Sequence, residues 1–194
     1  GEQGAIDYLS QSGKPFATGP SVNIYNPRSL QLLAKLGLKR WVFPVELSRD
    51  TLAAMQRQRP EGVETEVFAW GRMPLAYAAR CFTARAHDLP KDDCQLRCLD
   101  YPQGQVLRTR EDENFLCLNG IQTQSAKTCN LIDAVGDMRE LGVDILRISP
   151  QPTHTRRIIE AFRGAINDEA VPVLDTLAAA GSCDGYWRGE AGML

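Results

Sequence analysis

The chain has 194 residues, of which 43% are hydrophobic and 24% are charged, and its formal net charge is −2. This composition is ordinary for a globular protein, and the length suits one domain, residues 1–194. No apolar run approaches the ~18 residues of a membrane helix, so we expect a cytoplasmic protein without a membrane span. The slightly acidic balance also argues against bulk nucleic-acid binding, and we expect no nucleic-acid partner from it.

The first half of the chain alternates between helix and strand patterns. A helix end is expected over residues 5–11, followed by a strand over 15–24. Asn26 and Pro27 then suit the N-cap and first position of a helix. A nearly all-apolar strand is expected over 41–47, a helix after Ser48, and a third strand over 63–70.

The second half resumes this rhythm after a polar, cysteine-containing segment. A hairpin turn is expected at residues 102–104 and a strand over 113–119, then a helix that starts at Ser125 or Thr128 and runs to 141. A buried strand over 143–148 and a helix from Thr153 or Thr155 to 165 follow. Repeated strand–helix units predict a parallel sheet with right-handed crossovers.

These units predict an α/β fold, a partial TIM-like (β/α) barrel with an inserted cysteine-containing loop. The chain starts at Gly1, inside a helix pattern, so we expect a fragment that lacks the N-terminal units of the barrel. No strand is followed by GxGxxG or GxxxxGK[ST], which argues against a dinucleotide site or a P-loop.

Three of the six cysteines lie in the inserted segment. Cys81, Cys94 and Cys98 are spaced C-x12-C-x3-C, with basic residues between them. Nearby positive charge favours the thiolate, which is the metal-binding form. The segment therefore suggests a zinc site or an iron–sulfur cluster. The alternative, that these are ordinary small buried residues, fits Cys117 in an apolar strand better than it fits this polar segment.

Polar side chains follow several of the expected strands. In a barrel or an open parallel sheet the carboxyl ends of the strands form the active-site face, so these side chains are expected to converge on one mouth. Arg72 is the strongest candidate for substrate binding because a guanidinium suits carboxylates. The full set is Asn23, Glu46, Arg72, Asn119 and Gln151.

Long stretches of the chain resemble a known family. The segments GPSVNIYN, RWVFPVELSRD, EVFAWGRMPLAY, LNGIQTQSAKTCNL and CDGYW, with the cysteine segment, resemble the collagenase-like peptidase family, whose catalytic type is unassigned. Within it they are similar to the subgroup of the ubiquinone biosynthesis protein UbiV. The family signature has a Glu-x-Phe-x-His-Gly-Ala-x-Cys character. Here Trp70, Arg72 and Pro74 replace the histidine, alanine and cysteine, which weakens a peptidase interpretation.

The resemblance implies a [4Fe–4S] cluster held by four cysteines. Cys81, Cys94 and Cys98 match three of these ligands, and the fourth is expected outside this chain, with Cys129 and Cys183 as reserve candidates. The resemblance further implies a heterodimer with a paralogous UbiU-like subunit and a lipid-binding accessory protein. Together they would hydroxylate the quinone ring without molecular oxygen, with prephenate as the oxygen donor.

Three alternatives stay open at this point. Some relatives hydroxylate an RNA base, and the chain could do the same, although its acidic balance argues against it. A peptidase would need a nucleophile paired with His87 or His154, and neither follows an expected strand. A zinc-stapled interaction module would use the same cysteines without any reaction.

Overall fold

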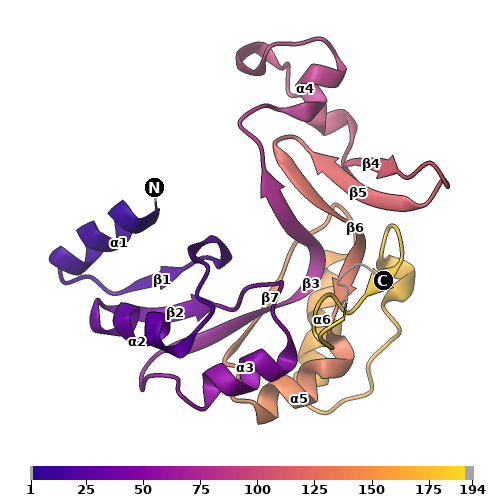
Figure 1. The fold of residues 1–194 in the computed structure, drawn as a ribbon. Coiled ribbons are helices and arrows are strands. Elements are labelled where there is room, and N and C mark those ends of the chain that lie inside the picture. The colour runs from indigo at the N-terminus through magenta and orange to yellow at the C-terminus, as the bar shows by residue number, and fades with distance from the viewer. Residues whose placement is uncertain (1, 191–194) are drawn as a thin grey trace.

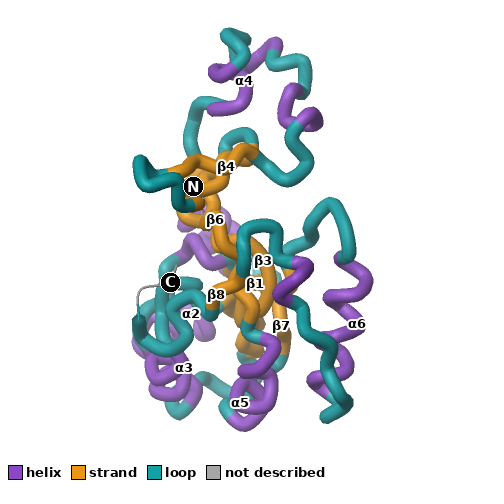
Figure 2. Tube along the Cα trace, turned by 90° about the vertical axis from the view of Figure 1, so that its right-hand side faces the viewer, coloured by secondary structure: helices purple, strands orange, loops and turns teal. Residues whose placement is uncertain are grey.

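The computed structural model describes residues 2–190 and shows a mixed α/β fold built on one eight-stranded sheet (Figure 1). The main strand order is β1-β2-β3-β6-β5-β4, and β7 pairs with β3 while β8 pairs with β6. The sheet has a compact parallel part, which we call the body. A narrow antiparallel part stands away from it, and we call this part, residues 71–129, the arm (Figures 1 and 2).

Four parallel strands form the body: β1 (Phe16–Thr18), β2 (Leu38–Val42), the first half of β3 (Glu64–Tyr77) and β7 (Ile145–Ile148). Helices connect and flank them, in agreement with the expected crossovers. They are α1 (Glu2–Gln11), α2 (Pro27–Lys35), α3 (Arg49–Gln56), α5 (Val135–Glu140) and α6 (Thr155–Ile166). In Figure 2, α2 and α3 lie on one side of the strands and α6 on the other.

Two helix starts follow from their capping residues. The Asn26 side chain accepts a hydrogen bond from the backbone N–H of Ser29 at 2.9 Å, and Ser48 caps α3 through Thr51 N at 3.4 Å. Each satisfies a donor that the first helical turn leaves without a partner. The predicted N-caps Asn26 and Ser48 are therefore confirmed.

The arm is built from the second half of β3 and three antiparallel partners. These are β6 (Gln122–Asn130), β5 (Asn114–Asn119) and β4 (Gln105–Arg108). The cysteine segment lies at the far end of the arm from the body (Figure 1). It contains α4 (Phe82–Ala86) and two 3-10 turns, Lys91–Asp93 and Arg97–Asp100. The short strand β8 (Ser182–Cys183) pairs in parallel with β6 and brings the last described residues back to the sheet.

Two apolar clusters hold the body together. The larger one packs α2 and α3 against the sheet around Trp41, which is fully buried. The smaller one packs α6 against β3, where the rings of Trp70 and Phe162 meet edge to face with centroids 6.5 Å apart. Burial of large aromatic side chains is among the strongest contributions to a core of this size.

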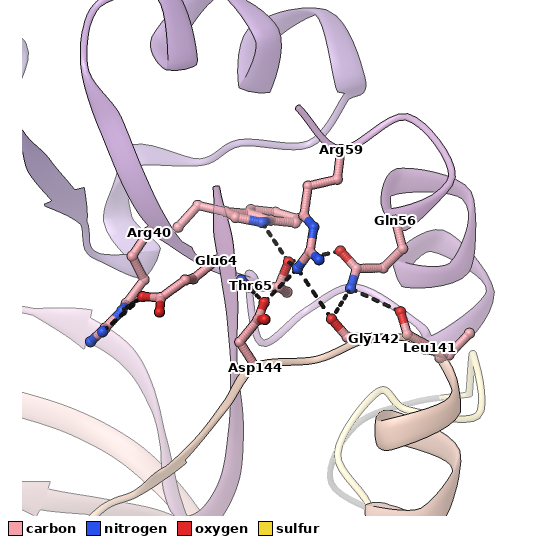
Figure 3. Close-up of polar contacts among 9 residues, drawn as sticks. Arg40, Gln56, Arg59, Glu64, Thr65, Leu141, Gly142 and Asp144 are labelled. Carbon is pink, nitrogen blue, oxygen red and sulfur yellow. Dashed lines mark hydrogen bonds and ion pairs between the residues drawn. The ribbon is translucent and has the colours of Figure 1, made fainter. Parts of the chain in front are cut away.

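A polar network ties the body together at the amino ends of β3 and β7 (Figure 3). The buried Thr65 hydroxyl donates to Gln56 Oε1 at 2.7 Å and accepts from Trp41 Nε1 at 3.0 Å. The Asp144 carboxylate accepts from the Thr65 N–H at 2.8 Å and from the Arg59 guanidinium. Every one of these groups is satisfied, so the network stabilises the end of the body that lies away from the strand termini expected to form a site.

Several expected boundaries are wrong in detail. The first two strands are shorter than the expected 15–24 and 41–47 and end earlier, before Pro20 and Pro44, which lack the N–H that a continuing ladder needs. The third strand continues past residue 70 to Tyr77. The hairpin turn lies at residues 109–113 rather than 102–104, with Thr109 N bonded to Glu113 O at 2.9 Å.

The largest correction concerns Ser125 and Thr128, which do not start a helix. Both lie inside β6, where the strand pairs with β3 on one side and β5 on the other. Ser125 is fully buried, and its Oγ accepts from Met73 N at 2.9 Å. Pairing on both edges outweighs the weak helical preference of this polar segment. The helix begins only at Val135.

The described strands form an open sheet, and a barrel stays a prediction. The parallel order β1-β2-β3-β7 with helical crossovers is what part of a barrel would contain. Within residues 2–190 no helix is both long and apolar enough to cross a bilayer.

Candidate functional site

A cleft runs along the carboxyl ends of β1, β2 and β7 and the middle of β3, where body and arm meet. It consists of three adjoining cavities that share lining residues. The outer cavity, of about 390 Å³, is lined by Asn23, Glu46, Tyr77 and Tyr186 among others. The inner cavity includes Arg72, Asn119 and Gln151, and the middle one joins the two. The structure therefore brings all five predicted polar side chains to one cleft.

Asn23 and Glu46 come from the loops that follow β1 and β2. Asn23 has a left-handed backbone conformation (φ 58°) that ends the 3-10 turn Pro20–Val22 and turns the chain across the cleft mouth. The Tyr25 hydroxyl donates a hydrogen bond to Glu46 Oε1. This bond, with smaller effects of burial and of the Glu46 charge, raises the pKa of Tyr25 above its usual value, so the phenol stays a donor at neutral pH.

Arg72 lies deeper, between the inner and middle cavities. Its Nη1 donates to Gln103 O and lies 2.8 Å from Cys117 Sγ, and its Nε donates to Ala126 O at 3.3 Å. All of these partners are neutral, and among residues 2–190 Arg72 forms no ion pair. Arg72 thus joins the cleft to the arm and brings a positive charge that no carboxylate in this part of the chain neutralises.

Gly71, next to Arg72, lets the cleft wall form. Its φ of +130° is unfavourable for any residue with a side chain, and a Cβ there would lie 2.4 Å from the Cβ of Ser149. Ser149 follows β7, so this close approach sets the strand end of β7 directly against β3. The neighbouring Trp70 donates to Gln151 Oε1 at 3.3 Å and holds that amide at the inner cavity.

Arg147 is a cleft residue that the sequence interpretation missed. It lies on β7, lines the middle cavity, and its Nε donates to the buried Glu66 of β3. Glu66 is also 3.9 Å from Arg40, which bonds Glu64 in turn at 2.9 Å. A signal for Arg147 was present, since a single arginine in the otherwise apolar run ILRI needs a partner.

The three cysteines of the predicted cluster all lie at the top of the arm. Cys81 is the N-cap of α4, where its Sγ accepts from Ala84 N at 3.4 Å. Cys94 directly follows the 3-10 turn Lys91–Asp93, and Cys98 lies in the turn Arg97–Asp100. All three are half-buried free thiols. Within residues 2–190, no group of three or more His, Cys, Asp or Glu side chains is arranged to hold a metal ion. The thiols are therefore not gathered into a ready-made cluster site, and iron–sulfur binding stays a prediction.

The other three cysteines are buried in the sheet. Cys117 is fully buried on β5, and this burial raises the pKa of its thiol more than Arg72 lowers it. Cys129 and Cys183 are directly paired across β6 and β8. Burial is the main cause that raises the pKa of Cys129 to about 12 and that of Cys183 above its usual value. Burial therefore disfavours the thiolate form of these cysteines as long as no metal ion is bound.

The comparisons with known proteins define the family. Residues 2–173 match the model of peptidase family U32. The chain belongs to peptidase family U32. The resemblance to a collagenase-like peptidase family is thus confirmed at the level of the family.

One curated relative is a "tRNA hydroxylation protein P1" of Bacillus subtilis (strain 168), which is 26% identical over 195 residues. The alignment covers 88% of this chain and 44% of the relative, so the chain spans less than half the length of that protein. No solved structure matches the chain. The U32 match and this relative do not single out the ubiquinone subgroup.

Proposed function

We propose that this U32 chain is part of a hydroxylation system that modifies an RNA base, with the cleft as the site that receives the base. The observation that carries the proposal is the relative named as a tRNA hydroxylation protein, whose alignment includes 88% of this chain. The whole protein's activity and substrate follow by analogy, because the chain spans only part of that relative.

The charges of the cleft support an RNA substrate. The net charge of −2 argues against nucleic-acid binding by the chain as a whole. Binding at one site depends instead on where the charges lie. Arg72 and Arg147 line the same cleft; Arg147 is paired with Glu66, whereas Arg72 is not neutralised by any carboxylate of the described chain. The exposed Tyr77 at the outer cavity adds a flat surface on which an unpaired base can stack.

Peptidase chemistry has less support in the structure. His87 bonds the Tyr101 hydroxyl at 3.0 Å in the arm, and His154 precedes α6. Within the described residues, no hydrogen bond joins either histidine to a serine, threonine or cysteine side chain. A pair of a nucleophile and a histidine base, as in a Ser–His or Cys–His peptidase, is therefore absent from this part of the chain.

Oxygen-independent ring hydroxylation in ubiquinone biosynthesis is the second candidate. It is favoured by Trp70, Arg72 and Pro74, which replace the histidine, alanine and cysteine of the family signature. Under this candidate the chain would act with the UbiU-like subunit and the lipid-binding accessory protein, and prephenate would supply the oxygen. Under either candidate, Cys81, Cys94 and Cys98 would be the residues that hold a [4Fe–4S] cluster.

Mass spectrometry of cells that lack the gene decides between the two candidates. Nucleosides from total RNA and quinones from the same cells are compared with those of the parent strain, grown without oxygen. Loss of a nucleoside that is 16 Da heavier than its unmodified parent nucleoside, restored by the full-length gene, would support RNA hydroxylation. Unchanged nucleosides together with loss of hydroxylated quinone would contradict it and support the second candidate.

A further inference from the structure

The outer cavity of the cleft has features that the proposed function leaves unexplained. Its volume of about 390 Å³ falls in the range of small-molecule sites. Most of its wall is apolar or aromatic: Pro20, Val45, Pro74, Leu75, Tyr77 and Tyr186. The polar groups are few and lie together at the loops after β1 and β2, where Ser21, Asn23 and Glu46 contribute. This is the composition of a site for a flat ring with a polar edge.

The aromatic side chains at this cavity have no stacking partner of their own. Tyr77, which lines the cavity, is 64% exposed. The ring pairs found within residues 2–190 join Trp41 with Phe43, Trp70 with Phe162 and His87 with Tyr101, so none of them involves a tyrosine of the cavity. An exposed ring on a strand that leads from the body into the arm offers one face to a ligand, and a stacked base contributes about 1–3 kcal/mol.

Glu46 determines which ring edge fits. A carboxylate only accepts hydrogen bonds, and the Tyr25 hydroxyl already occupies part of the Glu46 acceptor capacity and fixes the orientation of the carboxylate. Glu46 is exposed and lines a cavity whose wall is otherwise mostly apolar, so its remaining lone pairs can accept from a ligand there. A ring edge that carries N–H groups satisfies them, whereas an edge of carbonyl oxygens alone would be repelled.

We propose that the outer cavity binds a single unpaired nucleobase, stacked on Tyr77, with Glu46 accepting hydrogen bonds from the N–H groups of its edge. This inference rests on the proposed function and adds to it the residues that select the base. Glu46 is then a specificity-determining residue, and Tyr25 is a positioning residue that orients the Glu46 carboxylate.

The test uses the full-length protein and fluorescent five-nucleotide RNAs of each base, measured by fluorescence anisotropy at fixed salt. A ribose-phosphate chain without bases is the reference ligand. The wild type is expected to bind at least one of the four RNAs more tightly than the reference. Glu46→Gln is expected to lower the affinity for that RNA about tenfold or more and to reduce the differences in affinity among the four RNAs. Tyr77→Ala is expected to lower the affinity for all four RNAs about fivefold or more. Tyr77→Phe keeps the stacking surface and is therefore expected to keep the affinity.

Glu61→Gln is the matched control, because Glu61 is an exposed glutamate outside the cleft and its loss changes the total charge equally. Wild-type affinity and base preference in Glu46→Gln would overturn the inference. Equal binding of base-free chain and RNA would also overturn it. Either of these two results would contradict the base site alone, and RNA hydroxylation would still be supported if the nucleoside analysis is positive. Conversely, Glu46-dependent RNA binding without any hydroxylated nucleoside would support the base site and contradict the proposed reaction.

Discussion

Arg72 Nη1 lies 2.8 Å from the Sγ atom of Cys117 and also donates to Gln103 O, so one side chain of the cleft holds both the strand β5 and the turn that follows the cysteine segment. Gly104 makes this possible, since a Cβ there would lie 2.4 Å from the same sulfur. The arm and the cleft are thus connected through a guanidinium and a buried thiol.

Replacing Arg72 should loosen this connection without unfolding the body. Arg72→Met keeps the length of the side chain and removes its donors, so the turn at residues 101–104 loses a hydrogen bond from a charged group, a contribution of about 1.5–3 kcal/mol. Faster amide hydrogen exchange is expected in β4 and in the turn before it, with α2 and α3 unchanged. Cys117→Ala should lower the free energy of unfolding by about 1–2 kcal/mol, because removing the buried sulfur leaves a cavity. Equal exchange in Arg72→Met and wild type would contradict the connection.

The cysteines of the arm should separate into two groups when the full-length protein is purified without oxygen. Cys94→Ala or Cys98→Ala is expected to abolish the visible absorption of an iron–sulfur cluster, because each removes one thiolate ligand. Cys117→Ala should retain it, since Cys117 is buried in β5. Unchanged iron and acid-labile sulfide in Cys94→Ala would remove Cys94 from the ligand set.

Two threonines give a matched pair for the energetics of buried hydroxyls. Thr65→Val removes the hydroxyl that bonds Trp41, Gln56 and Arg59 (Figure 3), and is expected to destabilise the protein by about 1–3 kcal/mol.

Thr18 is equally buried, but its Oγ1 has no hydrogen-bond partner among the described residues. The same substitution there, Thr18→Val, should be neutral or stabilising by up to about 1 kcal/mol, because it removes a buried polar atom without a partner. Urea unfolding of both variants measures the difference, and a loss of the same size at both positions would contradict the argument.

Acid should weaken the contact between α3 and α5. The Arg49 guanidinium binds both oxygens of Asp137 at 2.7 Å, which holds the pKa of Asp137 below its usual value of 3.8. A lowered carboxyl pKa contributes stability above the unfolded value, and this contribution is lost as the pH falls below about 4. Asp137→Asn should therefore lower Tm at pH 7, and the difference from wild type should shrink towards pH 3. Asp50→Asn, at the exposed partner of Arg49, should show no such trend.

Local signals in the sequence predicted the body well. Asn26 and Ser48 are capping residues followed by helical apolar spacing, and each determines its helix within a few residues. The polar residues after the strands were found because the carboxyl ends of parallel strands share one edge.

The arm was harder to predict because its structure depends on distant pairing. The segment of Ser125 and Thr128 has no alternating apolar pattern, and only its two neighbouring strands make it a strand. The contact between Arg72 and Cys117 joins residues 45 positions apart and leaves no local pattern. Arg147 was visible as a charge in an apolar strand, but its partner Glu66 could be identified only from the register of β3 and β7.

The uninterrupted strand β3 has a consequence for how the length of this chain can vary. Glu66 meets Arg147 in the first half of β3, and Arg72 meets Gln103 in the second half. The stretch between them contains one irregularity of register, between Phe68 and Trp70. Because side chains otherwise alternate between the two faces of a strand, inserting or deleting one further residue would turn one of these contacts to the wrong face. The number of residues between Glu66 and Arg72 is therefore fixed. The loop segments between Ala78 and Gln105 are not constrained to a fixed number of residues in this way. Homologous chains are therefore expected to differ in length there and not in β3.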